Sequence, residues 1–363
     1  MHHRLKHEPT REGPTGTTGT NLTHVETRTT DAVSLLSRVD EMIADGRSEE
    51  ALGLVAAENR RRRDPMLERE LVMLRHRSFQ PRTEAVPAHT PVTASDPSDN
   101  LLEIEAPELD LEVLRAHLSI QGCVLVRGLL ERQRALDLAA GIDHALEAFD
   151  AYGGEGSEDD EGWYFPFTPD PGRYRVGGRR KWVRASGAVW TADSPRMLAS
   201  LTDLLTETGI GELVTEYLGE RPALSANKCT LRRVPLDTNV GWHQDGAFLG
   251  QEVRTLNLWL ALGDCGTDAP GLDLVPRRFD EVLPSGTEGA MFDWSVAPDV
   301  VERSAGSVGI VRPEFRAGDA LLFDHLFLHS TAVEPTMTRE RHAMETWFFA
   351  PSAYPDGQIP LAF

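Results

Sequence analysis

Two histidines and one aspartate are the residues whose types and spacing best suit metal chemistry. His243 and Asp245 lie two positions apart in the segment Gly241-Trp-His-Gln-Asp-Gly-Ala-Phe248. If this segment is a strand, both side chains point to the same face, and an imidazole nitrogen and a carboxylate oxygen can reach one metal ion. The alternative is a turn with a surface hydrogen bond between the two side chains, since one His-x-Asp can arise by chance among 12 histidines.

A third ligand is expected near the end of the chain, in Ala317-Gly-Asp-Ala-Leu-Leu-Phe-Asp-His-Leu-Phe-Leu-His-Ser-Thr331. A Gly-Asp turn leads there into an apolar run that ends in His329. His325 is a second candidate, because an even separation places both histidines on one face of a strand. Two histidines and one carboxylate that leave coordination positions open are typical of non-haem Fe(II) oxygenases.

An arginine follows this segment at the start of another expected strand. Arg341 opens Arg341-His-Ala-Met-Glu-Thr-Trp-Phe-Phe-Ala350. A buried guanidinium can hold a dicarboxylate through two parallel hydrogen bonds. Arg339 is the alternative, but it precedes the strand and suits a solvated turn.

The elements that must position these residues are short strands preceded by helices. Helices are expected at Leu111–His117 and Arg132–Phe149, around a strand at Cys123–Arg127. Short strands separated by Gly, Pro and Asp indicate a sandwich or barrel of the jelly-roll kind. The predicted class is therefore α+β, with a double-stranded β-helix core and flanking helices. The expected strands are Lys228–Val234, Thr255–Leu262, Leu272–Val275, Gly309–Arg312, Ala320–Phe323 and Ala343–Ala350.

The chain before residue 101 differs in composition and in the spacing of its apolar residues. Residues 1–30 are rich in Thr, Gly, Pro and charge and are expected to be a disordered tail. Residues 31–80 show helical spacing of apolar side chains and predict a helical hairpin or a three-helix unit, which could serve self-association or protein docking. Residues 81–100 hold several prolines and are expected to be a linker. The main domain is then 101–363.

Composition excludes several function classes. The 363 residues carry a formal net charge of -20, most of it after residue 100, so nucleic acid is not expected as a partner. No run approaches the length of apolar sequence that a membrane span needs, and the polar start lacks the apolar segment of a signal peptide. Three scattered cysteines fit a reducing compartment. A cytoplasmic enzyme acting on small molecules is the expectation.

Residues 101–355 resemble the phytanoyl-CoA dioxygenase family of Fe(II)- and 2-oxoglutarate-dependent oxygenases. The likeness is sharpest at four segments and at His329. After Val275-Pro276, Arg277-Arg-Phe279 replaces the Gly-Ser-His usual in the family, which affects the entrance near this loop. The four segments are Trp242-His-Gln-Asp-Gly246, Leu258-Trp-Leu-Ala-Leu262, Ala269-Pro-Gly-Leu-Asp-Leu-Val-Pro276 and Ala317-Gly-Asp319, and Arg341-His-Ala343 matches the family's Arg-x-Ala.

The resemblance implies a role for each of these residues. His243, Asp245 and His329 would bind Fe(II), and the spacing from Gly318-Asp319 favours His329 over His325. Arg341 would bind the distal carboxylate of the co-substrate 2-oxoglutarate. Trp259 would line the co-substrate pocket and the Thr331 hydroxyl would help hold the co-substrate. Dioxygen would take the last coordination position.

The implied reaction is hydroxylation of an unactivated C–H bond, with succinate and CO2 as co-products. Related halogenases have a small residue at the position of Asp245, so a carboxylate there favours hydroxylation. The alternative is an inactive metal-binding jelly roll that acts as a binding or scaffold module.

Basic residues give the only indication of the substrate. Lys181 and Arg184 belong to a cluster with Arg173, Arg175, Arg179 and Arg180 that could surround a carboxylate, a phosphate or an acyl thioester. Acidic residues 155–161 could equally neutralise this cluster. Lys228 and Arg232 are expected on one face of the strand before the His-x-Asp segment, where they point to the substrate or to solvent at a strand edge.

Overall fold

The structure is a computed structural model, and it describes residues 33–82, 100–153, 161–238 and 241–363. The expected tail at 1–30 and nearly all of the expected linker at 81–100 lie outside the described residues. The chain divides into two compact units, Met1–Val55 and Ala56–Phe363. In the described part, no helix is both long and apolar enough to cross a membrane.

Three helices occupy the region where a helical unit was expected. Residues 33–44 form the first helix, followed by α2 (Ser48–Arg62) and α3 (Pro65–Arg77). The Asp64 carboxylate accepts a hydrogen bond from the Met66 amide and caps α3. Helix α3 belongs to the second unit, where the buried Glu68 carboxylate pairs with Arg196 of α7 at 2.8 Å. Self-association or docking through these helices stays a prediction.

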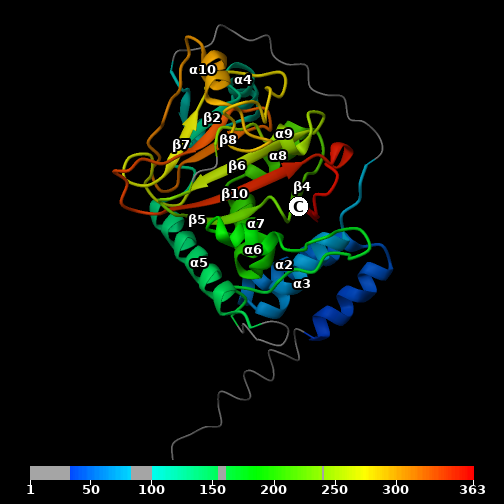
Figure 1. Cartoon of the computed structure of the whole chain (residues 1–363). Coiled ribbons are helices and arrows are strands. Elements are labelled where there is room, and N and C mark those ends of the chain that lie inside the picture. Colours follow the sequence, from blue (N-terminus) through cyan, green and yellow to red (C-terminus); the bar gives the residue numbers. More distant parts are fainter. Residues whose placement is uncertain (1–32, 83–99, 154–160, 239–240) are drawn as a thin grey trace, which may run out of the picture. The chain divides into compact units, whose positions relative to one another are not determined.

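A nine-stranded sheet forms the centre of the second unit (Figure 1). Seven strands follow the order β1-β2-β8-β6-β10-β4-β11, while β5 pairs with β10 and β3 pairs with β5. All pairs are antiparallel except β1 with β2. The strands are β1 (Glu103–Glu105), β2 (Cys123–Arg127), β3 (Ala188–Trp190), β4 (Ala223–Ser225), β5 (Thr230–Val234), β6 (Thr255–Ala261), β8 (Ala320–Phe323), β10 (Arg341–Phe349) and β11 (Pro360–Ala362).

One face of this sheet is covered by helices. Side chains such as Leu258 of β6 and Phe348 of β10 form a fully buried apolar core with the helices. In Figure 1, α5 and α7 lie on one side of β6 and β10, while β7 and α10 lie on the other. The helices that contribute to this core are α3, through Val72, and α4 (Leu111–Gln121), α5 (Arg132–Ala151), α7 (Pro195–Glu207) and α8 (Ile210–Leu218).

The opposite face looks toward a two-stranded sheet of β7 (Gly271–Leu274) and β9 (His329–Ala332). A second apolar cluster contains Trp259 and Trp347 from the large sheet and Leu272 and Leu274 from the small one. The two sheets therefore enclose a common interior. Helices α6 (Arg179–Ala185), α9 (Gly246–Leu249) and α10 (Pro298–Ala305) and three 3-10 turns, Ala106–Glu108, Thr191–Asp193 and Pro351–Ala353, complete the elements.

The Gly318-Asp319 turn fixes the start of β8 against the end of β2. Gly318 has φ of 101°, and a Cβ there would lie 2.1 Å from the Leu130 carbonyl oxygen, so only glycine fits. The Asp319 carboxylate accepts hydrogen bonds from the Gly128 and Arg316 amides. This turn places β8 in register, and β8 leads directly to His329.

The prediction of mixed helices and strands is confirmed, while the double-stranded β-helix stays a prediction. The expected strand Gly309–Arg312 is wrong: within it only Val311 forms a bridge, to Leu274. Helices α9 and α10 interrupt the strand region, so the chain does not run simply from helices to strands.

Candidate metal centre

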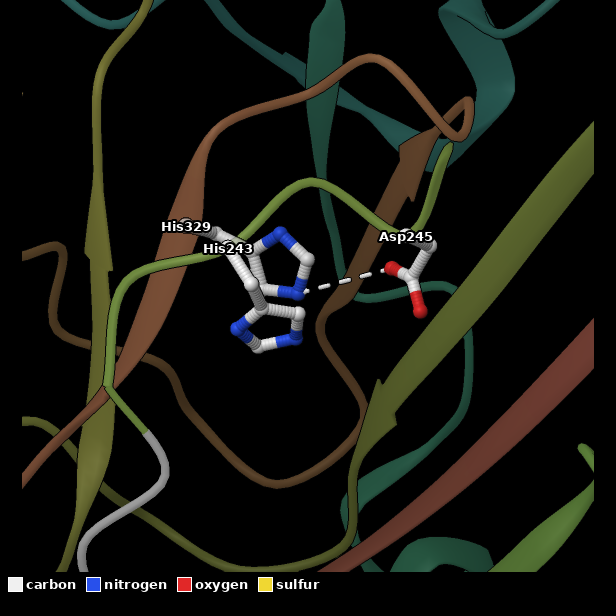
Figure 2. Close-up of side chains that lie close together, drawn as sticks. All are labelled: His243, Asp245 and His329. Carbon is white, nitrogen blue, oxygen red and sulfur yellow. Dashed lines mark ion pairs between the residues drawn. The ribbon is translucent and has the colours of Figure 1, made fainter. Parts of the chain in front are cut away.

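A backbone bridge brings the two histidines side by side. The His243 amide donates to the His329 carbonyl at 2.9 Å, and the His329 amide donates to the His243 carbonyl at 3.1 Å. Directly paired residues of an antiparallel bridge point to the same side. The ring centroids accordingly lie 4.4 Å apart, and Figure 2 shows both rings facing the Asp245 carboxylate.

Backbone carbonyls orient both imidazole rings. His243 Nδ1 lies 3.0 Å from the Gly241 carbonyl oxygen, and His329 Nδ1 lies 3.1 Å from the Phe327 carbonyl oxygen. A carbonyl can only accept, so each Nδ1 carries the proton and each Nε2 presents a lone pair. This is the arrangement in which a carbonyl fixes the tautomer of a metal-binding histidine.

Asp245 completes a cluster whose three ligand atoms all lie within 4.8 Å of one another. Its Oδ2 is 3.9 Å from His329 Nε2, the pair marked in Figure 2. The expectation that His243 and Asp245 lie on one strand is wrong. Asp245 has helical φ and ψ values of -62° and -23° and precedes α9. The carboxylate reaches the histidines because the chain turns into this helix.

Close packing fixes that turn. The Gly246 amide donates to the His325 carbonyl at 2.8 Å. A Cβ at Gly246 would lie 2.8 Å from Val282 Cγ2 and 3.2 Å from the His325 carbonyl oxygen. A side chain at position 246 would therefore require Val282 or His325 to shift.

Burial sets the protonation of the cluster. It lowers the pKa of His243 well below its usual value, and the neighbouring His329 lowers it further, so the His243 ring is neutral near pH 7. Burial raises the pKa of Asp245, while Lys228 and His329 oppose that change. Two imidazoles and one carboxylate whose ligand atoms converge suit a divalent cation.

Gln244 is a positioning residue that sequence reasoning missed. Its fully buried side chain donates to the Leu326 carbonyl at 2.6 Å and accepts from the Leu283 amide at 2.6 Å. The amide thus ties the segment between the two ligands to the segment before His329. The signal was present, since a polar residue between two ligand positions points away from the metal and must find partners.

The alternative histidine lies outside the cluster. His325 Nε2 is 3.0 Å from the Gln251 carbonyl oxygen, and the three-residue cluster contains His329 instead. The alternative arginine is also elsewhere: Arg339 is exposed and forms a bidentate pair with Asp268.

Arg341 is buried, with 2% of its surface exposed. It lies on the face of the large sheet that looks toward the small sheet, and we call this face the floor of the interior. Its Nη1 donates to the Gly271 carbonyl at 2.6 Å, and its guanidinium carbon lies 5.2 Å from the centroid of the Trp259 ring. Burial lowers the pKa of Arg341 to about 10, so the side chain stays charged near neutral pH. The Arg341 Nε has no hydrogen-bond partner among the described residues.

Unpartnered polar atoms gather on this floor. In the described chain, Trp259 Nε1, Arg232 Nε and Asn257 Oδ1 are also buried without a partner. The strand register places these residues on the same face as Arg341, because Arg232 is opposite Ala343, Trp259 opposite Glu345 and Asn257 opposite Trp347. Three N–H donors left without acceptors are costly unless an anion fills the space. They fit a dicarboxylate such as 2-oxoglutarate.

Glu345 is a second residue that sequence reasoning missed. It lies on the face of Arg341 and accepts hydrogen bonds from Thr230 Oγ1 and Arg232 Nη1, both at 2.9 Å. Burial favours the neutral acid, but Arg232, the Thr230 hydrogen bond and Arg341 together outweigh burial, and the pKa of Glu345 is lowered overall. Its even spacing from Arg341 along β10 was the available signal.

Thr331 lies in β9 opposite Leu272, two residues after His329. Residues two apart in a strand share a face, so Thr331 lies on the side of the ligand histidine. Its side chain is partly exposed.

The candidate substrate residues separate into two groups. Lys228 lies at the metal cluster, where it favours the ionised Asp245, and Arg232 lies on the floor. Lys228 is in the turn before β5, so the prediction that it shares a strand with Arg232 is wrong. Arg184 of α6 pairs with Asp150, and Lys181 is exposed on α6 and is not part of the metal cluster.

The basic residues at 173–184 do not form one continuous positively charged surface. Arg180 is largely buried and pairs with Asp193, while its guanidinium lies 5.1 Å from the centroid of the Trp190 ring. The partners of Arg180 and Arg184 are thus Asp193 and Asp150. Most of the acidic segment expected to neutralise this cluster, at 155–161, lies outside the described residues.

Aromatic residues beside His243 form a feature that the sequence did not indicate. Trp294 packs edge-on against His243, with ring centroids 5.3 Å apart, and stacks on Phe292 at 4.9 Å. Phe248 contacts both His243 and Trp294. The segment is held by a hydrogen bond from the Val296 amide to the Trp242 carbonyl.

A family comparison agrees with this geometry. Residues 184–341 match the model of the family described as phytanoyl-CoA dioxygenase (PhyH). That range contains all three members of the cluster, and Arg341 is its last residue. No curated protein matches the chain.

Several solved structures resemble the chain at low identity. AviO1 from Streptomyces viridochromogenes Tue57 is 22% identical with a TM-score of 0.42, over 68% of this chain and 98% of that one. EctD from S. alaskensis with 2-oxoglutarate and 5-hydroxyectoine is 15% identical with a TM-score of 0.49, over 77% and 88%. The α-ketoglutarate-dependent carbocyclase SnoK is 18% identical with a TM-score of 0.45, over 67% and 85%.

Proposed function

Through residues 184–341 the chain belongs to the phytanoyl-CoA dioxygenase family, and from that premise we propose that it hydroxylates an unactivated C–H bond of a small organic substrate. The chain is a 2-oxoglutarate-dependent non-haem iron dioxygenase. We propose His243, Asp245 and His329 as the iron ligands. The observation that carries this assignment is the convergence of their three ligand atoms within 4.8 Å.

The protein's own part in the reaction is to bind, orient and exclude water. The carbonyls of Gly241 and Phe327 hold the imidazoles in the tautomer that leaves Nε2 available. Iron with 2-oxoglutarate and O2 supplies the oxidising power, and succinate and CO2 are the co-products. Phe323 and Phe327 pack against the His329 ring and exclude water from that side.

Arg341, Trp259 and Thr331 are proposed to hold 2-oxoglutarate. Arg341 offers a charged donor at the buried end, and Trp259 offers an N–H that has no partner among the described residues. A dicarboxylate that satisfies both donors removes the cost of leaving them unpaired. Asp245 keeps a carboxylate at the metal, which favours hydroxylation over halogenation.

Two measurements test the proposal, iron binding and turnover of 2-oxoglutarate. Both are made on the unaltered chain and on a variant that lacks one proposed iron ligand. The purified chain is incubated with Fe(II), 2-oxoglutarate, ascorbate and a library of small organic molecules, and succinate is measured. We expect succinate release that disappears in His243→Ala together with bound iron. His117→Ala, which replaces a histidine of α4, is the matched control and should keep both.

The alternative is an inactive metal-binding module. It predicts iron binding that depends on His243 but no succinate with any library member. A chain that binds no iron contradicts both functions.

A further inference from the structure

Lys228 is a cation beside the metal cluster that the proposed reaction does not use. It lies in the turn between β4 and β5, and its Nζ is 3.6 Å from the centroid of the Phe248 ring. Phe248 follows Asp245 by three positions in α9, which places the ammonium at the same end of the interior as the metal ligands.

The ammonium group has no anionic partner in the described part of the chain. No carboxylate lies within the 4.0 Å of an ion pair, and no hydrogen bond to Nζ is seen. Asp245 and Glu345 act on Lys228 at longer range and raise its pKa, but burial outweighs them and lowers it overall. The nearby carboxylates are engaged otherwise, since Glu345 pairs with Arg232 and Asp245 belongs to the metal cluster.

Exposed apolar side chains surround the same end of the interior. Phe248, Met291 and Phe292 are 39%, 48% and 43% exposed, and they are three of the ten large apolar residues exposed in the described chain. Trp294 links Phe248 and Phe292 to His243 through ring contacts. Exposed apolar side chains gathered in one place, in ring contact with a ligand histidine of the metal cluster, mark a ligand surface rather than random exposure.

These two observations lead to one substrate class. We propose that the substrate is an organic anion whose apolar body lies on Phe248, Phe292 and Trp294 and whose anionic group pairs with Lys228. This inference rests on the proposed function and adds what the reaction acts on. A cationic substrate bound on these rings would be repelled by the ammonium ion over Phe248.

The charge requirement can be measured by binding, without turnover. The chain is loaded anaerobically with Fe(II) and 2-oxoglutarate and titrated calorimetrically with ω-phenylalkanoates of increasing chain length and with their primary amides. The amides keep the shape and remove the charge. We expect the best carboxylate to bind at least about tenfold more tightly than its amide, as expected of a hydrogen bond to a charged group.

Substitutions at Lys228 test whether its ammonium group causes the preference for the carboxylate over the amide. Lys228→Met keeps the length of the side chain and should bring the carboxylate to the affinity of the amide, while Lys228→Arg should retain most of the preference. Arg134→Met removes an exposed cation on α5, which packs on the opposite face of the large sheet, and should change neither affinity.

Phe292→Ala tests the apolar surface separately. It should weaken the carboxylate and the amide by the same factor, about threefold to tenfold, because it removes contact area and no charge.

Three outcomes would overturn the proposal. One is equal affinity for carboxylates and amides in the unaltered chain. Another is an undiminished preference in Lys228→Met. The third is a Lys228→Met variant that loses 2-oxoglutarate instead, which would make Lys228 a co-substrate residue. If the unaltered chain binds neither iron nor 2-oxoglutarate, the proposed function has failed instead, so the two failures are distinguishable.

Discussion

The two faces of strand β10 have opposite characters although they alternate residue by residue. Met344 and Phe348 point into the apolar core beneath the helices, and both are at most 1% exposed. Arg341 and Glu345 point to the other face, toward the small sheet and the metal cluster. Period-two alternation lets one strand serve a packed core and a polar interior at once.

The two faces also differ in their polar groups, although the buried Thr346 Oγ1 on the helix face lacks a partner in the described chain too. On the helix face, the polar side chains His342 and Arg233 both reach Asp143 of α5. On the metal face, Arg341 Nε, Arg232 Nε and Trp259 Nε1 are buried without partners in the described chain. The metal face therefore retains buried N–H groups without acceptors, which a ligand can satisfy.

The largest expected effect is on activity, from a change on the metal face. His329→Ala removes one of two imidazoles and leaves too few ligands to hold Fe(II) against chelators. We expect succinate release to fall to background and bound iron, measured by metal analysis after gel filtration, to fall with it. The midpoint of thermal unfolding without iron should change little, and a large decrease would mean that this face also supports the fold.

The corresponding experiment on the helix face shortens a buried side chain of β10. Phe348 is fully buried, and Phe348→Ala should lower the free energy of unfolding by about 3–5 kcal/mol. Denaturant titration measures this loss. The fraction that remains folded should bind iron and 2-oxoglutarate with unchanged affinity, and a loss of either affinity would show that the two faces are coupled.

Arg341→Met should affect co-substrate binding selectively. Losing a charged donor to a carboxylate costs about 1.5–3 kcal/mol per hydrogen bond. The affinity for 2-oxoglutarate should therefore fall by about tenfold to a hundredfold. Competition binding with the iron-loaded chain measures it. Iron affinity itself should be retained, and Arg339→Met, an exposed neighbour, serves as the control.

Arg232→Met should have a smaller effect through Glu345. Removing Arg232 leaves the Glu345 carboxylate with Thr230 as its remaining hydrogen-bond partner in the described chain, so Glu345 should bind a proton more readily. We expect 2-oxoglutarate binding to weaken by a few fold and to become more pH dependent. The double variant with Glu345→Gln should restore part of the loss, and a purely additive double variant would contradict the coupling.

The smallest effect is expected for a surface pair that belongs to neither face. A hydrogen bond from Arg132 lowers the pKa of Asp264 to about 2, below its usual value of 3.8. A depressed pKa stabilises the fold above the ordinary value, and the stabilisation disappears as pH falls from about 4 to 2. The pair is about half exposed, so Asp264→Asn should cost about 1 kcal/mol or less at pH 7. The cost should vanish near pH 2, as urea titrations at both pH values would show.

The local pattern of apolar and polar residues predicted the exact bounds of some strands. The bounds of β2 at Cys123–Arg127 and of β8 at Ala320–Phe323 match the expected strands, because both are short apolar runs between polar turns. Gly309–Arg312 failed, since one apolar residue in an irregular stretch forms a single bridge. The residues outside the described ranges leave the expected tail and linker as predictions.

The candidate site shows the same division. Residue type and spacing nominated His243, Asp245 and either His325 or His329, and the family resemblance favoured His329. The strand geometry invoked for His243 and Asp245 is absent, because Asp245 lies at the start of α9. The tertiary structure decided that His329 rather than His325 faces Asp245, since the backbone bridge to His243 selects it.

What the sequence determined by itself was the set of chemical groups available and the alternation that separates Arg341 and Glu345 from Met344 and Phe348. What only the tertiary structure decided was which of those groups meet, and which charges remain unpaired. Lys228 and Arg184 are both basic residues without acidic neighbours in the sequence, but folding gives Arg184 the Asp150 carboxylate and leaves Lys228 above the Phe248 ring. Pairing depends on distances between segments far apart in the chain, and local residue order does not contain those distances.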